Sequence, residues 1–226
     1  MRASAIITAA GSGQRLGRGA PKAFVKLGGR TMLSYSLASV ASVPGIEEVI
    51  ITVPAGMETV ARSETSQIKL PVKIVAGGAE RQDSIRIALS FSSAESELIV
   101  IHDAARPFAD ARLFDRCLEA AKRSGGAIAA VPVSDTLKRG ENGAIIATVP
   151  RAGLWQAQTP QAFLRSLIIA AHERATREKI IATDDADLVE QIGARVELIE
   201  SSTRNIKITT PSDLEIAEAI LTSLRS

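Results

Sequence analysis

The sequence is poor in the residues that mark several classes of protein. It has one cysteine and two histidines, so neither an internal disulfide nor a cysteine or histidine metal cluster can be built. Aromatic residues make up 3% of the chain, and aliphatic side chains must therefore fill the core. The net charge of +2, without a basic run, gives no reason to expect nucleic-acid binding. No apolar run approaches the roughly 20 residues that a membrane-spanning helix needs.

The length and the N-terminus favour a cytoplasmic protein with one domain, residues 1–226. The first residues lack the charged, apolar and cleavable layout of a secretion signal. The single cysteine, Cys117, falls on the apolar side of an expected helix. We interpret it as a packed thiol rather than a nucleophile.

Strand-like and helical patterns alternate along most of the chain, which predicts an α/β fold. A Rossmann-like, mostly parallel sheet with helices on both faces is typical of this alternation. The expected strands span 5–9, 48–53, 72–76, 98–102, 127–133, 195–199 and 206–209. The expected helices span 32–42, 57–66, 84–93, 112–124, 165–177, 185–192 and 212–224.

One segment, about 134–162, departs from the alternation. It consists of extended pieces around a turn at 139–144, which predicts a β-hairpin arm that leaves the sheet. Such an arm would either cover the edge of the sheet, or cap a site or reach a second subunit. The residues alone leave both interpretations open.

The segment from Ala9 to Lys22 predicts a phosphate-binding loop. It follows a short apolar strand and reads Ala-Ala-Gly-Ser-Gly-Gln-Arg-Leu-Gly-Arg-Gly-Ala-Pro-Lys. Glycines let backbone amides approach an anion, and Arg15, Arg18 and Lys22 add positive charge. Leu16 occupies the third glycine position of the dinucleotide fingerprint, and no glycine pair has P-loop spacing. A nicotinamide-dependent oxidoreductase is therefore disfavoured, and a non-catalytic nucleotide-binding module would not need both Arg15 and Lys22.

Four further segments carry polar residues near expected loop ends: 77–84, 102–107, 184–187 and Lys207. Each has a structural alternative, such as a helix cap at Ser84 or Asp184, or a local Asp103–Arg106 pair. The carboxyl ends of parallel strands meet at one edge of a sheet, so we expect these groups to be close together. Glycine amides, basic side chains and one or two acids suit nucleotidyl transfer, in which alignment and charge neutralisation dominate.

These motifs together resemble the 2-C-methyl-D-erythritol 4-phosphate cytidylyltransferase family, over essentially the whole chain. The first loop resembles that of many nucleotidyltransferases, whereas the combination is specific. The matching segments are the loop of Ala9 to Lys22, Gly77-Gly78 with Arg81 and Ser84, 102–107, 135–138, Arg151 with 153–155 and 159–161, 183–184 and 205–207. The resemblance implies the fold of nucleotide-diphospho-sugar transferases and transfer of CMP from CTP to methylerythritol phosphate. It also implies a homodimer through the arm and Mg²⁺ carried mainly by the CTP phosphates, with no protein metal ligand.

The resemblance also implies residue roles. Arg15 and Lys22 would stabilise the α-phosphate, while Lys207 and Arg151, the latter from the neighbouring subunit, would position the acceptor. The implied catalytic residues are Arg15, Lys22, Arg151 and Lys207. The implied substrate-binding residues are Ala9, Ala10, Gly11, Ser12, Gly13, Gly78, Arg81, Ser84, Asp103, Ala104, Arg106, Thr136, Thr159 and Thr183.

The chain departs from the family pattern at three positions, where Thr8, Gln14 and Ala79 replace frequent Pro, Arg and Asp. None of these is an implied catalytic residue, so the departures bear on CTP affinity more than on chemistry. A cytidylyltransferase for another polyol phosphate, such as ribitol 5-phosphate, is the alternative within the same reaction class.

Overall fold

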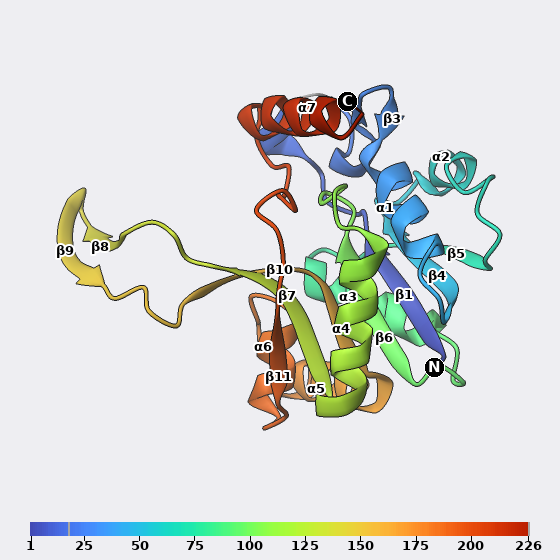
Figure 1. The fold of residues 1–226 in the computed structure, drawn as a ribbon. Helices are drawn as coiled ribbons and strands as arrows, with labels where there is room; N and C mark the ends of the chain where they lie inside the picture. Colours follow the sequence, from blue (N-terminus) through green and yellow to red (C-terminus); the bar gives the residue numbers. More distant parts are fainter. Residues whose placement is uncertain (18, 226) are drawn as a thin grey trace.

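The computed structural model describes residues 1–17 and 19–225, and its centre is a seven-stranded sheet in the order β11-β7-β10-β6-β1-β4-β5 (Figure 1). Strand β10 is antiparallel to both of its neighbours, and the other pairings are parallel. Arg18 of the glycine-rich loop lies outside the described residues. The strands are β1 (Ala3–Thr8), β4 (Ile46–Val53), β5 (Val72–Ala76), β6 (Leu98–Asp103), β7 (Gly126–Pro132), β10 (Trp155–Leu164) and β11 (Val196–Glu200).

Helices cover both faces of the sheet because alternate strand residues point to opposite sides. In β1, Ala5 and Ile7 join the core under α1 (Met32–Ala41), α2 (Glu58–Ser63) and α4 (Ala111–Ser124). Ile6 joins the core under α3 (Arg81–Phe91), α5 (Arg165–Glu178) and α6 (Asp185–Gln191). The predicted α/β sandwich is confirmed. None of the helices in the described part of the chain is long and apolar enough to cross a membrane.

A third, smaller core lies at the carboxyl end of the sheet. Helix α7 (Pro211–Arg225) packs there through Leu214 and Leu221 against the short strands β2 (Lys26–Leu27) and β3 (Arg30–Thr31). Two 3-10 turns, η1 (Gln14–Leu16) and η2 (Lys22–Phe24), lie within the glycine-rich loop and at its end. The third core supports this loop.

Two expectations about strands were wrong. The segment 206–209 is not a strand; it crosses the carboxyl edge of the sheet with Ile208 buried under α7. The apolar alternation of residues 206–209 arises from the burial of Ile208, not from hydrogen bonding to a neighbouring strand. Residues of β10 were expected to belong to the arm at 134–162, but β10 lies in the central sheet between β6 and β7.

The arm itself is a two-stranded hairpin of β8 (Leu137–Glu141) and β9 (Ala144–Val149) that projects from the body (Figure 1). Asn142 and Gly143 have positive φ angles of 49° and 79°, as a tight hairpin turn requires. Ile145 and Ile146 are 68% and 55% exposed.

Cys117 is fully buried in α4, which confirms the interpretation of a packed thiol. Burial raises the pKa of this thiol to about 12.

Candidate active site

A cavity of about 690 Å³ opens at the carboxyl ends of β1, β5 and β6. From β1 the chain builds outward to β4 and β5 and then returns to β6 on the other side, so β1 and β6 flank a topological switch point. The cavity is lined by Thr8, Ala9, Ala10, Gly11, Ser12, Gly13, Gln14, Arg15, Lys22, Ala23, Gly78, Ala79, Glu80, Arg81, Ser84, Asp103, Ala104, Ala105, Lys207 and Thr209. The glycine-rich loop, the segments 77–84 and 102–107, and Lys207 therefore meet as predicted, whereas no residue of 184–187 lines the cavity.

The glycine-rich loop turns back on itself so that Lys22 lies beside its start. The Lys22 amide donates to the Gly11 carbonyl at 3.4 Å. Gly13 has a φ of 70°, and a Cβ there would lie 2.8 Å from the Lys22 nitrogen. Only glycine permits both this left-handed conformation and this close approach. The loop is thus shaped to present Lys22, and not only to expose amides.

Lys22 lies in an environment with excess positive charge. Its ammonium reaches Thr209 Oγ1 at 3.4 Å from a half-buried position. Burial lowers the pKa of Lys22 to about 8, and the neighbouring charge of Lys207 adds to the effect. Arg15 contributes in the same direction. A cavity with three such cations is suited to a ligand that carries several negative charges.

The loop after β5 forms a close-packed wall of the cavity. A Cβ on Gly77 would lie 2.5 Å from Ala10 Cβ, so the two loops touch here. Helix α3 begins at Arg81, not at Ser84 as expected, and Ser84 does not cap it. The Ser84 hydroxyl accepts from the Gly78 amide and donates to the Glu80 carbonyl, both at 3.1 Å. Ser84 therefore shapes the wall of the cavity.

Asp103, at the end of β6, connects several elements of the site. Its Oδ1 accepts from Arg81 Nε at 3.1 Å and from the Thr8 hydroxyl at 3.0 Å, while its Oδ2 lies 2.6 Å from Lys207 Nζ. Burial alone would raise the pKa of Asp103, but the charges of Arg81 and Lys207 outweigh it and hold that pKa well below its usual range. Asp103 is therefore a charged anchor for cations.

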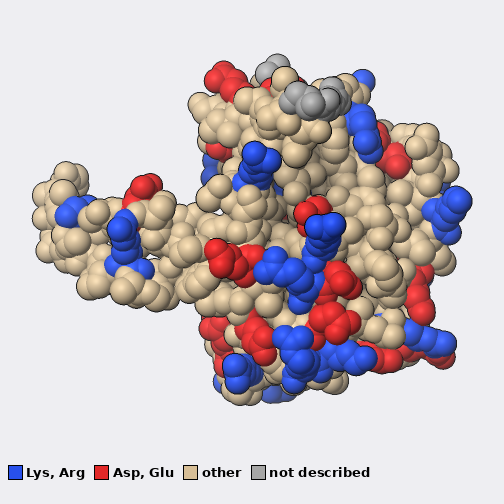
Figure 2. Space-filling view, in the orientation of Figure 1, with Lys and Arg blue, Asp and Glu red and all other residues tan. Residues whose placement is uncertain are grey.

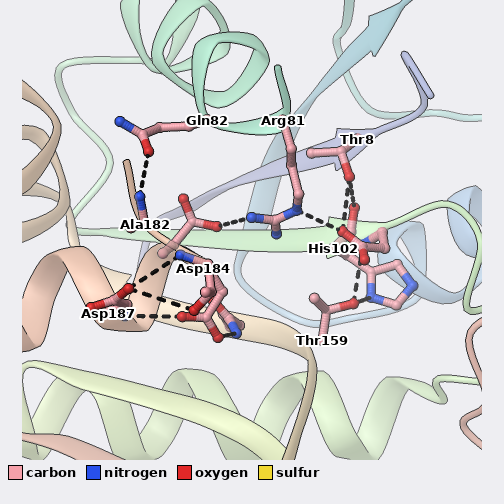
Figure 3. A network of polar contacts seen from close by, with 12 residues as sticks. Thr8, Arg81, Gln82, His102, Thr159, Ala182, Asp184 and Asp187 are labelled. Carbon is pink, nitrogen blue, oxygen red and sulfur yellow. Dashed lines mark hydrogen bonds and ion pairs between the residues drawn. The ribbon is translucent and has the colours of Figure 1, made fainter. Parts of the chain in front are cut away.

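His102 and Thr159 hold the backbone of Asp103 from behind. His102 Nε2 faces the Arg106 carbonyl at 3.2 Å and must donate, so Nδ1 accepts from the Thr159 hydroxyl at 2.9 Å. The same hydroxyl accepts from the Asp103 amide at 3.0 Å (Figure 3). Burial lowers the pKa of His102 to about 4, which keeps the ring neutral. His102 is therefore a packed, hydrogen-bonded residue that supports Asp103.

Lys207 reaches Asp103 through an irregular segment that is tied to the sheet. The Ile208 amide donates to the Ala105 carbonyl at 2.9 Å. The Arg106 guanidinium donates to the Asn205 carbonyl at 2.7 Å and to the Ala157 carbonyl at 3.5 Å. Arg106 thus connects this segment to β10 through two backbone carbonyls. Among the described residues, no hydrogen bond or ion pair joins its guanidinium to the Asp103 side chain, so the local pair considered from the sequence is not formed.

The structure does not bring every predicted residue to the cavity. Thr136 and Arg151 are exposed on the arm, where the Arg151 guanidinium contacts the Ser134 carbonyl. Thr183 is exposed at the start of α6, and its amide donates to Asp187 at 3.1 Å. Thr159 is buried in β10 behind Asp103. None of these four residues lines the cavity within one chain.

Sequence reasoning missed two buried residues next to the cavity. The predicted cap at Asp184 is confirmed, since its side chain accepts from the Asp187 amide. Asp185 was expected only as one of the acids in the first turn of that helix. Asp185 instead lies 2.7 Å from Arg81 NH1 and 3.1 Å from His172 Nε2. The available signal was an acidic residue on the side of the short helix α6 that faces the protein interior. The sequence does not show that its partners are Arg81 and His172.

The residues at the site do not form a cation site of their own. Among residues 1–17 and 19–225, no group of three or more His, Cys, Asp or Glu side chains is arranged to hold a metal. The buried acid of the cavity, Asp103, has both oxygens engaged by Arg81, Thr8 and Lys207. This donor set suits phosphate groups and does not suit a bare divalent ion.

Comparisons with known proteins match nearly the whole chain to one family. The family model for 2-C-methyl-D-erythritol 4-phosphate cytidylyltransferase matches residues 3–223. The enzyme of that name from Deinococcus radiodurans is 44% identical over 219 residues, or 97% of this chain and 89% of the relative. A solved 4-diphosphocytidyl-2C-methyl-D-erythritol synthase from Anaerococcus prevotii has a TM-score of 0.88 and 32% identity, covering 98% and 96% of the two chains. The cytidylyltransferase structure from Thermus thermophilus has a TM-score of 0.82 and 38% identity, covering 96% and 98%.

Proposed function

The chain belongs to the 2-C-methyl-D-erythritol 4-phosphate cytidylyltransferase family, and we propose that it transfers CMP from CTP to 2-C-methyl-D-erythritol 4-phosphate. A phosphate oxygen of the acceptor attacks the α-phosphorus of CTP and forms the new P–O bond. The bond from that phosphorus to the β-phosphate oxygen breaks, and pyrophosphate leaves with the electron pair. The products are 4-diphosphocytidyl-2-C-methyl-D-erythritol and pyrophosphate.

The observation that carries this proposal is the convergence of Arg15, Lys22 and Lys207 on one cavity at the switch point of the sheet. Negative charge on the equatorial oxygens must be neutralised as phosphorus becomes five-coordinate. We assign that task to Arg15 and Lys22. The low pKa of Lys22 supports this role, because its positive charge is under-compensated until an anion binds.

We propose separate places for the two substrates. The residues from Ala9 to Gly13, with Gly78 and the wall formed by Ser84, surround the nucleotide. Asp103 and Ala104, at the end of β6, lie where sugar hydroxyls would be bound. Lys207, on the opposite side of the Asp103 carboxylate from Arg81, positions the phosphate of the acceptor.

Magnesium is proposed to arrive as part of the CTP complex. A divalent ion bound by the triphosphate would lower its charge and order the leaving group. Since the Asp103 oxygens are already engaged by cations and a hydroxyl, the protein's own part is to bind the phosphates. No step is assigned here to a protein-bound metal.

The arm supports a homodimer in which each subunit completes its partner's site. Hairpin β8–β9 projects from the body, as Figure 1 shows, and its Ile145 and Ile146 are exposed. An isolated two-stranded hairpin has little stability alone. The face in Figure 2 has acidic and basic side chains interspersed, on the arm as on the body. We propose that the arm packs on a second copy and brings Arg151 and Thr136 into the acceptor site of that copy.

The test is pyrophosphate release from CTP and Mg²⁺ with either methylerythritol phosphate or ribitol 5-phosphate as acceptor. We expect turnover with methylerythritol phosphate and little with ribitol 5-phosphate. Turnover with ribitol 5-phosphate alone would replace the proposed acceptor with the alternative. ATP, GTP and UTP serve as donor controls and should react poorly.

A further inference from the structure

Arg81 bridges two buried carboxylates that belong to different parts of the fold. Its Nε lies 3.1 Å from Asp103 Oδ1, and its NH1 lies 2.7 Å from Asp185 Oδ2. The side chains of Asp103 and Asp185 are 8% and 2% exposed. In Figure 3, Arg81 extends between the side that carries Thr8 and His102 and the side that carries Asp184 and Asp187. One guanidinium therefore joins the end of β6 to the start of α6.

Asp185 is in turn held from below by α5. His172 Nε2 lies 3.1 Å from Asp185 Oδ1, and the two side chains are 3% and 2% exposed. The carboxylate thus uses one oxygen for His172 and the other for Arg81. This bonding leaves Asp185 one orientation, and it directs Oδ2 at the Arg81 guanidinium.

The partition of Arg81 between two acids has a consequence for Lys207. A guanidinium favours two parallel bonds to a single carboxylate when nothing competes for it. Here NH1 donates to Asp185, which orients the guanidinium toward α6, and the contact of Arg81 with Asp103 is the bond from Nε to Oδ1. Oδ2 of Asp103 remains for Lys207, which lies 2.6 Å from it.

We propose that Asp185, oriented by His172, is a positioning residue that keeps Arg81 off Oδ2 of Asp103 and so keeps Lys207 in place for the acceptor phosphate. Asp185 lines no part of the cavity itself and acts through Arg81. The proposal rests on the proposed function in that Lys207 is taken to bind the acceptor. Without the Asp185 charge, Arg81 turns onto both oxygens of Asp103, and Lys207 loses its anchor.

The kinetic test uses D185N, which preserves shape and removes the charge. We expect the KM for methylerythritol phosphate to rise at least tenfold while the KM for CTP changes less than about threefold. D187N is the matched control, because Asp187 lies on the same helical turn but bonds Thr183 and Gln191, not Arg81. H172F should shift the acceptor KM in the same direction, and H172Q, which keeps a donor, should restore it. Equal effects of D185N on both KM values would overturn the proposal.

A second measurement separates this proposal from the proposed function. If wild-type enzyme turns over neither acceptor, the function fails, and the positioning role is still tested by urea denaturation. Asp185 and Lys207 both interact with the Arg81–Asp103 pair but are not themselves paired. K207M should lower the denaturation midpoint at least twice as much in the wild-type background as in D185N. Equal shifts of the midpoint in both backgrounds would overturn the positioning role of Asp185. If D185N does not fold, H172F takes its place in this comparison.

Discussion

A Cβ atom on Gly13 would lie 2.8 Å from the backbone nitrogen of Lys22. The contact is between two parts of the backbone, so neither side can yield by a change of rotamer. It fixes how far the glycine-rich loop turns back and therefore where Lys22 enters the cavity. The loop is best understood as a support for one lysine.

The first prediction concerns this contact. Gly13→Ala should lower kcat/KM for CTP by about 100-fold, because displacing a catalytic group by about 1 Å costs roughly that factor. Gly17→Ala is the matched control: Gly17 also has a positive φ, of 65°, but a Cβ there meets nothing within 4 Å. It should reduce kcat/KM by less than about threefold. Equal losses in the two variants would assign the effect to backbone strain alone.

Lys22 itself should act on the transition state more than on binding. Lys22→Ala should lower kcat by about 100-fold or more and leave the KM for CTP within a few fold. Lys26→Ala is the control, since Lys26 is exposed on β2 and does not line the cavity. A raised KM with unchanged kcat would instead make Lys22 a ground-state binder.

The pH dependence follows from the low pKa of Lys22, about 8. Raising the pH through 8 removes its proton in the free enzyme, so kcat/KM for CTP should fall on the alkaline side of about pH 8. In the complex the phosphates favour the charged form, and the alkaline limb of kcat should lie at higher pH. Lys22→Arg should shift the kcat/KM limb upward, because arginine stays protonated there. A limb that Lys22→Arg does not move belongs to another group.

Thr159 should matter for stability through the hydrogen bonds behind Asp103. Thr159→Val leaves the Asp103 amide and His102 Nδ1 without their shared partner, both in the interior. We expect the free energy of unfolding to drop by about 2–4 kcal/mol, measured by urea denaturation. Thr159→Ser keeps the hydroxyl and should lose about 1 kcal/mol at most. A loss for Thr159→Val no larger than that for Thr159→Ser would contradict this role of the hydroxyl.

Subunit mixing tests the proposed sharing of Arg151. Lys22→Ala and Arg151→Ala should each be nearly inactive alone. Mixed and re-assembled at equal amounts, they should recover about a quarter of wild-type activity, because half of the dimers then carry one intact site of two. Sedimentation of each variant checks that dimers form. If no activity returns, Arg151 serves its own subunit.

Much of the site could be predicted from the sequence because its signals are local. The loop from Ala9 to Lys22 and the Gly77–Gly78 pair follow strands that short apolar runs identify. Parallel strands then bring their carboxyl ends together at one edge, whatever the details of packing. The resemblance to the cytidylyltransferase family, seen in the same motifs, was confirmed by the match over residues 3–223.

Other features depended on contacts that no local pattern encodes. Lys207 was expected within a strand over 206–209, yet it pairs with Asp103 because its irregular segment is tied across the edge of the sheet. Asp185 looked like a cap acid, yet it is buried against Arg81 and His172. β10 looked like part of an arm, since an extended segment does not reveal its pairing partners.

The sequence by itself determined the alternation of strands and helices, the glycine-rich loop and its position after β1. Periodicity and glycine conformation act over a few residues, so these features are written in the chain. Only the tertiary structure decided which charges meet: Arg81 between two aspartates, and Lys207 on the free oxygen of one of them. Ion pairing inside a protein depends on which distant segments of the chain are buried together, and the tertiary fold decides which segments those are.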